Sequence, residues 1–300
     1  MGSILERTAA VIGRHFALFV VTTAIVIGIP IAVGIYTILG VQAAELQAML
    51  HQLAAGEHST APSWPFFAPQ FRRLIYGESL YLLGLLLEPV AFAAVAADVD
   101  AILRTGRVRL RFGFARVFVR LPQILGVLVL SILVDLGAMA AGILVIAGAV
   151  GAVIVAYRDA THSILLLSAV ITIALFVLAA VAIAFVLIGM ALYFALFAAT
   201  VERKGVVSSV GSGFERIFAR REWKRALLIA LIAIVWFSVS PLAGSVLAGM
   251  VNLVPGGTAF AAALDALVFA TVVAVGAVLY AVYYHDVCGR EASTSLPASS

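Results

Sequence analysis

The sequence predicts an all-α, polytopic integral membrane protein with about six transmembrane helices in three pseudo-repeated hairpins, each preceded by a basic amphipathic interfacial helix. Hydrophobic residues make up 64% of the 300 residues and charged residues 11%, whereas a soluble domain is about half apolar and about a quarter charged. A soluble fold cannot bury that much apolar surface, so lipid is the expected solvent for most of the chain. Long apolar runs and a repeated basic motif support the same fold class.

The chain contains six apolar runs, each longer than the ~20 residues that a helix needs to cross ~30 Å of hydrocarbon. They occupy about 16–41, 79–103, 123–156, 164–201, 226–251 and 263–284. The third and fourth exceed the length of one crossing, so we expect these two helices to extend beyond the membrane on one side. The runs predict a single transmembrane domain over 1–291, with an outer loop at 42–78 and a disordered tail at 292–300.

A basic amphipathic motif precedes the third and fifth apolar runs. The segment 113–120, Gly-Phe-Ala-Arg-Val-Phe-Val-Arg, returns at 213–220 as Gly-Phe-Glu-Arg-Ile-Phe-Ala-Arg, and a fainter copy opens the chain at 11–14. The apolar positions follow i, i+4, i+7, i+8 spacing, which forms one stripe of a helix. Such helices lie in the membrane interface and bind anionic headgroups through their basic edge. The candidate residues for headgroup or partner binding are Arg109, Arg116, Arg120, Arg216, Arg220, Lys224 and Arg225.

The distribution of Lys and Arg predicts the orientation. With both termini inside, 16 of the 19 basic residues fall in cytoplasmic segments, and only Arg72, Arg73 and Arg158 fall outside. Because cytoplasmic connections carry the excess of Lys and Arg, the sequence predicts an N-in, C-in topology. The net charge of +4 resides in these connections, which favours anionic lipid headgroups over nucleic acid as partners.

Two carboxylates, Glu88 and Asp135, lie in the second and third apolar runs, away from any basic residue. Counted from the nearest connections at 1.5 Å per residue, both fall near the middle of the membrane. Charges at that depth are costly and often mark an ion or proton path. The alternative is a protonated acid that forms a structural hydrogen bond. Both interpretations stay open.

Other carboxylates lie beside basic residues where the even-numbered runs end: Asp98, Asp100, Glu202 and Asp286. We expect them to bond to the nearby arginines as structural ties at the membrane interface. A headgroup or cation site is the alternative. Because Asp98 and Asp100 are two residues apart, they do not share one helix face.

No motif of a soluble catalytic site, cofactor or metal centre occurs. The chain lacks a Gly-x-Ser-x-Gly elbow, a His-Glu-x-x-His helix and a phosphate-binding loop. Its five histidines have no ligand-like spacing, and a single cysteine, Cys288, excludes an internal disulfide. The sequence therefore predicts a protein without enzymatic activity, cofactor or metal.

Glu202 with the basic stretch after it, and the aromatic segment from Tyr280 to Arg290, resemble a known family. The family is the six-helix membrane domain found with some bacterial glycerophosphodiester phosphodiesterases, together with its stand-alone relatives of uncharacterised role. The resemblance implies a bacterial inner-membrane protein. It does not imply hydrolysis, because the His-Arg-Gly opening and the soluble barrel of the catalytic domain are missing.

Three functional classes remain. The favoured one is a non-enzymatic accessory or scaffold subunit, or a lipid-organising protein, whose basic helices bind anionic headgroups and possible partner subunits. The second is a transporter or channel that uses Glu88 and Asp135. The third, an enzyme acting on lipid, lacks a recognisable nucleophile or metal set.

Overall fold

The computed structural model describes residues 2–54, 64–108, 111–159, 164–219, 222–252 and 257–295. Throughout these ranges the regular structure is helical, so the predicted all-α class is confirmed. Five of the described helical segments are long and apolar enough to cross a membrane: Gly2–Val41, Phe71–Thr105, Leu121–Tyr157, Ser168–Thr200 and Thr258–Glu291. The predicted run 226–251 lies within a further helix, some of whose side chains are outside the described part, and its crossing stays a prediction.

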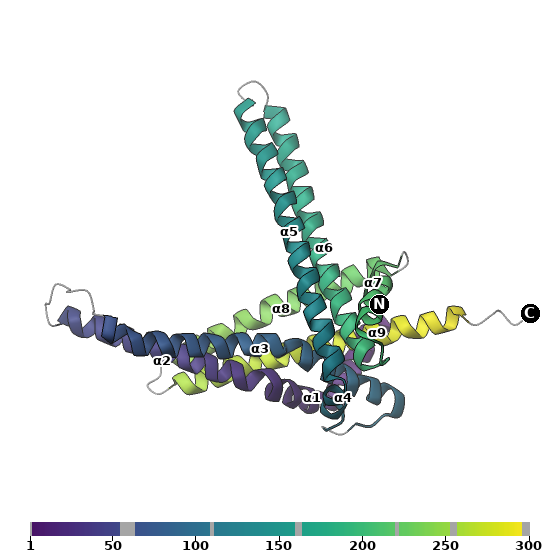
Figure 1. Cartoon of the computed structure of the whole chain (residues 1–300), viewed down its shortest axis with the longest axis horizontal. Helices are drawn as coiled ribbons and strands as arrows, with labels where there is room; N and C mark the ends of the chain where they lie inside the picture. The colour runs from purple at the N-terminus through teal and green to yellow at the C-terminus, as the bar shows by residue number, and fades with distance from the viewer. Residues whose placement is uncertain are drawn as a thin grey trace, which may run out of the picture. The chain divides into compact units, whose positions relative to one another are not determined.

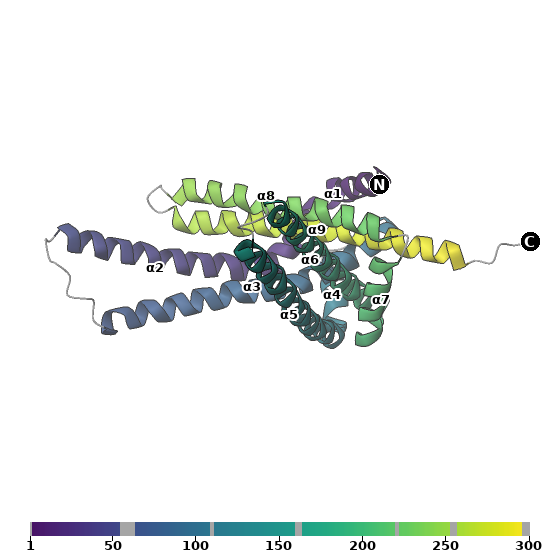
Figure 2. The ribbon, with the colours of Figure 1, turned by 90° about the horizontal axis from the view of Figure 1, so that it is seen from above.

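The chain divides into two compact units, residues 1–117 with 233–300, and residues 118–232. Unit 1 contains α1 (Gly2–Thr23), a π-helical turn η1 (Ala24–Gly28), α2 (Ile29–Ala54), α3 (Trp64–Thr105) and α9 (Thr258–Ser295). Two helices cross the boundary between the units, α4 (Arg111–Val119) and α8 (Trp223–Asn252). In unit 1, α2 lies beside α3, and α9 packs against α1, α2 and α3 (Figure 1, Figure 2).

Small side chains form part of the core of unit 1, beside large ones such as Tyr283 and Phe92. Every residue from Ala91 to Asp100 of α3 is buried, and five of these ten are alanines. On α9, Ala270, Ala274 and Ala277 are at most 1% exposed. Small residues let helix backbones approach closely, which is how helices associate in lipid, where the hydrophobic effect between them is weak.

Helices α2 and α3 extend into the segment 42–78 that the sequence assigns to an outer loop. The helix α2 runs to Ala54 and α3 begins at Trp64. Pro65 is compatible with this start because the first-turn N–H groups of a helix have no partner within the helix. The connection between these helices, 55–63, lies outside the described residues.

Unit 2 is a long helical hairpin with a short helix packed on its second arm. Its arms are α5 (Leu121–Asp159) and α6 (Ile164–Thr200), which lie side by side (Figure 1). At 1.5 Å per residue, the 39 residues of α5 measure about 58 Å, almost twice the ~30 Å of a hydrocarbon core. The short helix α7 (Val206–Phe218) packs against α6.

Candidate anion-binding site

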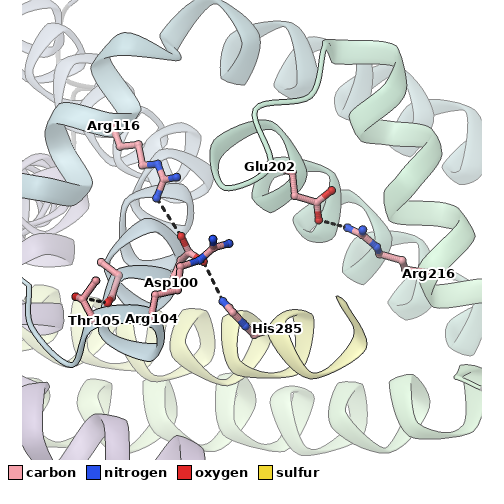
Figure 3. Close-up of polar contacts among 8 residues, drawn as sticks. Asp100, Arg104, Thr105, Arg116, Glu202, Arg216 and His285 are labelled. Atoms are coloured by element: carbon pink, nitrogen blue, oxygen red, sulfur yellow. Dashed lines mark hydrogen bonds and ion pairs between the residues drawn. The ribbon is translucent and has the colours of Figure 1, made fainter. Parts of the chain in front are cut away.

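Asp100 is the centre of a polar cluster at the end of α3 in unit 1. Its side chain is only 3% exposed and meets three basic groups from three helices (Figure 3). Arg104 Nε donates to Oδ1 at 2.7 Å, and Arg116 Nη1 of α4 donates to Oδ2 at 3.1 Å. His285 Nε2 of α9 lies 2.9 Å from Oδ1. The carboxylate therefore ties α3, α4 and α9 together.

A similar pair joins the end of α6 to α7 in unit 2. Glu202 Oε1 accepts a hydrogen bond from Arg216 Nη1 at 2.6 Å (Figure 3). The other oxygen, Oε2, lies 2.9 Å from Lys204 Nζ. Arg116 and Arg216 occupy the same position in the repeated motif. On α9, Asp286 pairs with Arg290 at 2.8 Å and approaches Arg7 at 4.0 Å. The expected ties to arginine are present for Asp100, Glu202 and Asp286. The prediction is wrong for Asp98, whose buried carboxylate lies against Gly113 of α4 and pairs with no described arginine.

The glycine that opens each motif copy allows the short helix to touch the long helix before it. A Cβ added at Gly113 would lie 2.6 Å from the carbonyl oxygen of Ala94 and 2.8 Å from Oδ2 of the buried Asp98. At Gly213 it would overlap the carbonyl oxygen of Ala191. Backbone contact this close requires glycine, which gives the repeated glycine a structural role that the sequence pattern alone does not explain.

A cavity of about 910 Å³ opens beside the Asp100 cluster. Its walls come from α1, the end of α3, the following turn and α4. Basic side chains dominate the polar part of this lining, which consists of His15, Asp100, Arg104, Thr105, Arg107, Arg111 and Arg116. The apolar part includes Val108 and Phe112. We call this feature the arginine cavity. Its lining contains four arginines and one carboxylate, so its net positive charge favours anions.

Of the predicted binding residues that the structure describes, Arg116 alone lines the arginine cavity. Arg109 and Arg220 lie outside the described residues. The other four predicted residues belong to unit 2. Arg216 is 8% exposed and bound to Glu202, whereas Arg120 follows α4 and is partly exposed. Lys224 Nζ lies 5.7 Å from the centre of the Trp223 ring, and Arg225 Nη1 lies 3.8 Å from Glu222 Oε1.

Sequence reasoning missed His15, Arg104, Arg107 and Arg111 as members of one site. The arginines are visible as a basic cluster after the second apolar run, in the stretch 104–120 that predicts binding of lipid or a partner, but only Arg109, Arg116 and Arg120 are single candidates there. No local pattern places His15 there, since it comes from α1 through tertiary packing.

The two carboxylates of the apolar runs, Glu88 and Asp135, fall in different units. Glu88 is half-buried in unit 1, near enough to Tyr280 of α9 for electrostatic interaction. Asp135 is exposed on α5 in unit 2. Sequence reasoning missed Asp265 of α9, a further carboxylate on a helix long and apolar enough to cross a membrane, whose Oδ1 faces Gly244 of α8. Among the described residues, no group of three or more His, Cys, Asp or Glu could hold a metal ion.

Searches against protein-family models, curated proteins and solved structures found no match to this chain. The resemblance to the six-helix membrane domain therefore stays an expectation from the sequence.

Proposed function

We propose that this chain is a non-enzymatic multi-pass protein of the bacterial inner membrane that binds anionic lipid headgroups, as an accessory subunit or lipid-organising scaffold. The observation that carries the proposal is the arginine cavity. It gathers four arginines at the end of α3, a helix apolar enough to cross a membrane. Basic groups at the boundary of a membrane helix are placed where headgroups lie.

Two of these arginines are available for an anion. The side chains of Arg107 and Arg111 are exposed, and neither forms an ion pair with a described carboxylate. Arg104 and Arg116 are held by Asp100. Because each basic residue near an anionic surface contributes about 1 kcal/mol, Arg107 and Arg111 together supply about 2 kcal/mol, or about 30-fold in Kd.

The topology we propose has six crossings, with α8 as the fifth, and both termini in the cytoplasm. The 16-to-3 division of basic residues supports it. In this arrangement α4 and α7 lie at the inner interface, each beside the end of the crossing helix before it. The cytoplasmic leaflet is rich in anionic lipid, so the arginine cavity would meet its ligands there.

The proposal is tested with the purified protein in neutral maltoside micelles. Dioctanoyl phosphatidylglycerol should bind more tightly than dioctanoyl phosphatidylcholine, and the difference should shrink as salt is raised. The double variant Arg107→Gln/Arg111→Gln should weaken phosphatidylglycerol binding by about 30-fold. The control, Arg72→Gln/Arg73→Gln, removes the same charge from exposed positions elsewhere on α3 and should bind like the parent. Equal affinity for the two lipids would refute the proposal.

A further inference from the structure

We infer that the arginine cavity selects a phosphomonoester headgroup, which carries two negative charges, over a phosphodiester headgroup, which carries one. The inference rests on the proposed binding of anionic headgroups and adds the chemical class of the preferred ligand. It depends on three features of the site: the charge of the lining, the way Asp100 holds two guanidinium groups, and the position of α4.

The lining carries a charge excess larger than one phosphodiester can neutralise. Four arginines and one carboxylate leave a formal excess of three positive charges, before any contribution from His15. Asp100 is already in contact with Arg104, Arg116 and His285, so its repulsion of an incoming anion is reduced. A monoanion leaves two charges uncompensated among neighbouring arginines, and a dianion leaves one.

The guanidinium groups are preorganised for phosphate. Asp100 fixes Arg104 through Nε, and the side chain of Arg104 remains 63% exposed. Arg116 is held by Asp100 and lies 5.6 Å from the centre of the Phe112 ring. A guanidinium offers five donors in a planar fork that matches phosphate oxygens in pairs. A terminal phosphate presents three unesterified oxygens to such donors, whereas a phosphodiester presents two.

The helix α4 adds a favourable dipole. It begins at Arg111, and Arg111 and Phe112 of its first turn line the arginine cavity. The N-terminus of a helix carries about half a positive charge and binds phosphate groups readily. This contribution grows with the charge of the ligand, so it also favours a dianion.

The phosphate could belong to a lipid or to a free metabolite, and the surroundings favour a lipid. Val108 and Phe112 give the lining an apolar part, which suits the glycerol and first acyl carbons of a lipid. The site also lies at the end of a helix that can cross a membrane. A free phosphate has no apolar part to contact Val108 and Phe112, and its binding does not require a site near the membrane.

The test compares four probes with the full-length protein in maltoside micelles at pH 8. They are dioctanoyl phosphatidate, dioctanoyl phosphatidylglycerol, dioctanoyl phosphatidylcholine and glycerol 3-phosphate. The expected result is a Kd for phosphatidate about tenfold lower than for phosphatidylglycerol, which equals about 1.4 kcal/mol. Arg107→Gln/Arg111→Gln should bring this ratio close to one, and Arg72→Gln/Arg73→Gln should leave it unchanged. Circular dichroism checks that both variants keep the helical content of the parent.

Lowering the pH supplies a second readout. A phosphomonoester loses its second charge below a pKa of about 6, so the ratio of the two dissociation constants should fall toward one at pH 5. The groups around the site are His15 of α1, Asp100 and Arg104 of α3, Arg107 of the following turn, Arg111 and Arg116 of α4, and His285 of α9. At pH 5 both headgroups carry a single negative charge, so the fall in the ratio reports the second charge of the phosphomonoester.

The outcomes distinguish a failure of the dianion preference from a failure of the proposed headgroup binding. Equal affinities for phosphatidate and phosphatidylglycerol, both above phosphatidylcholine, would overturn the dianion preference and leave headgroup binding intact. Equal affinities for all three lipids would refute headgroup binding itself. Glycerol 3-phosphate binding as tightly as phosphatidate would show that the ligand is a free phosphomonoester and would overturn the lipid assignment.

Discussion

Replacing Gly213 by alanine tests whether α7 packs against α6 through direct backbone contact. The new Cβ would overlap the carbonyl oxygen of Ala191 and lie 2.9 Å from the backbone nitrogen of Ala195. Both atoms belong to the helical backbone of α6, so relief requires α7 to move. Overpacking of this kind costs about 1–3 kcal/mol.

Gly211 provides the matched control because it lies two residues earlier in the same helix and has no atom within 4 Å of an added Cβ. At this position alanine stabilises the protein only through its higher helix propensity, by about 0.5–1 kcal/mol. The same gain accompanies Gly213→Ala, so the difference between the two variants isolates the steric cost. We expect Gly211→Ala to stabilise the protein and Gly213→Ala to be about 1–3 kcal/mol less stable than Gly211→Ala.

The assay is equilibrium unfolding in mixed dodecylsulfate and maltoside micelles, followed by far-UV circular dichroism. The equivalent variant in the other motif copy, Gly113→Ala, should behave like Gly213→Ala, since its Cβ would lie 2.6 Å from the carbonyl oxygen of Ala94. If Gly213→Ala and Gly211→Ala have the same unfolding midpoint, the close contact between α7 and α6 is not present in the membrane protein.

Two further substitutions test the polar groups. Glu202→Gln removes the charge that pairs with Arg216, whose side chain is only 9% exposed, and should cost about 3 kcal/mol in the same unfolding assay. Lys204→Gln removes the more exposed partner of Glu202 and should cost under about 1 kcal/mol. Similar losses from both variants would contradict the burial argument. Glu88→Gln preserves the shape of a protonated acid while abolishing titration, so a protein without transport activity should retain its stability and its proton permeability in reconstituted vesicles. A pH-driven flux in the parent that vanishes in this variant, measured with an entrapped pH-sensitive dye, would replace the proposed function by proton transport.

The sequence by itself determined the solvent and the type of structure. With 64% hydrophobic residues, the chain has no soluble alternative, and apolar runs of this length can satisfy their backbone hydrogen bonds in lipid only as helices. The repeated motif also located the two short helices. Carboxylates at the ends of the apolar runs predicted ion pairs with nearby basic groups, but the pairing of Glu202 with Arg216, 14 residues away, depends on the packing of α7 on α6.

Tertiary structure decided which arginines are free to bind. Hydrophobic periodicity identifies the apolar face of a short helix, but it does not show which neighbouring helix covers the charged edge. Arg216 is predicted as a headgroup ligand, yet it is buried against Glu202. Arg107 and Arg111 are left exposed, and His15 reaches the same cavity from α1. Their proximity depends on contacts between helices that lie far apart along the chain, which no spacing rule in one sequence encodes.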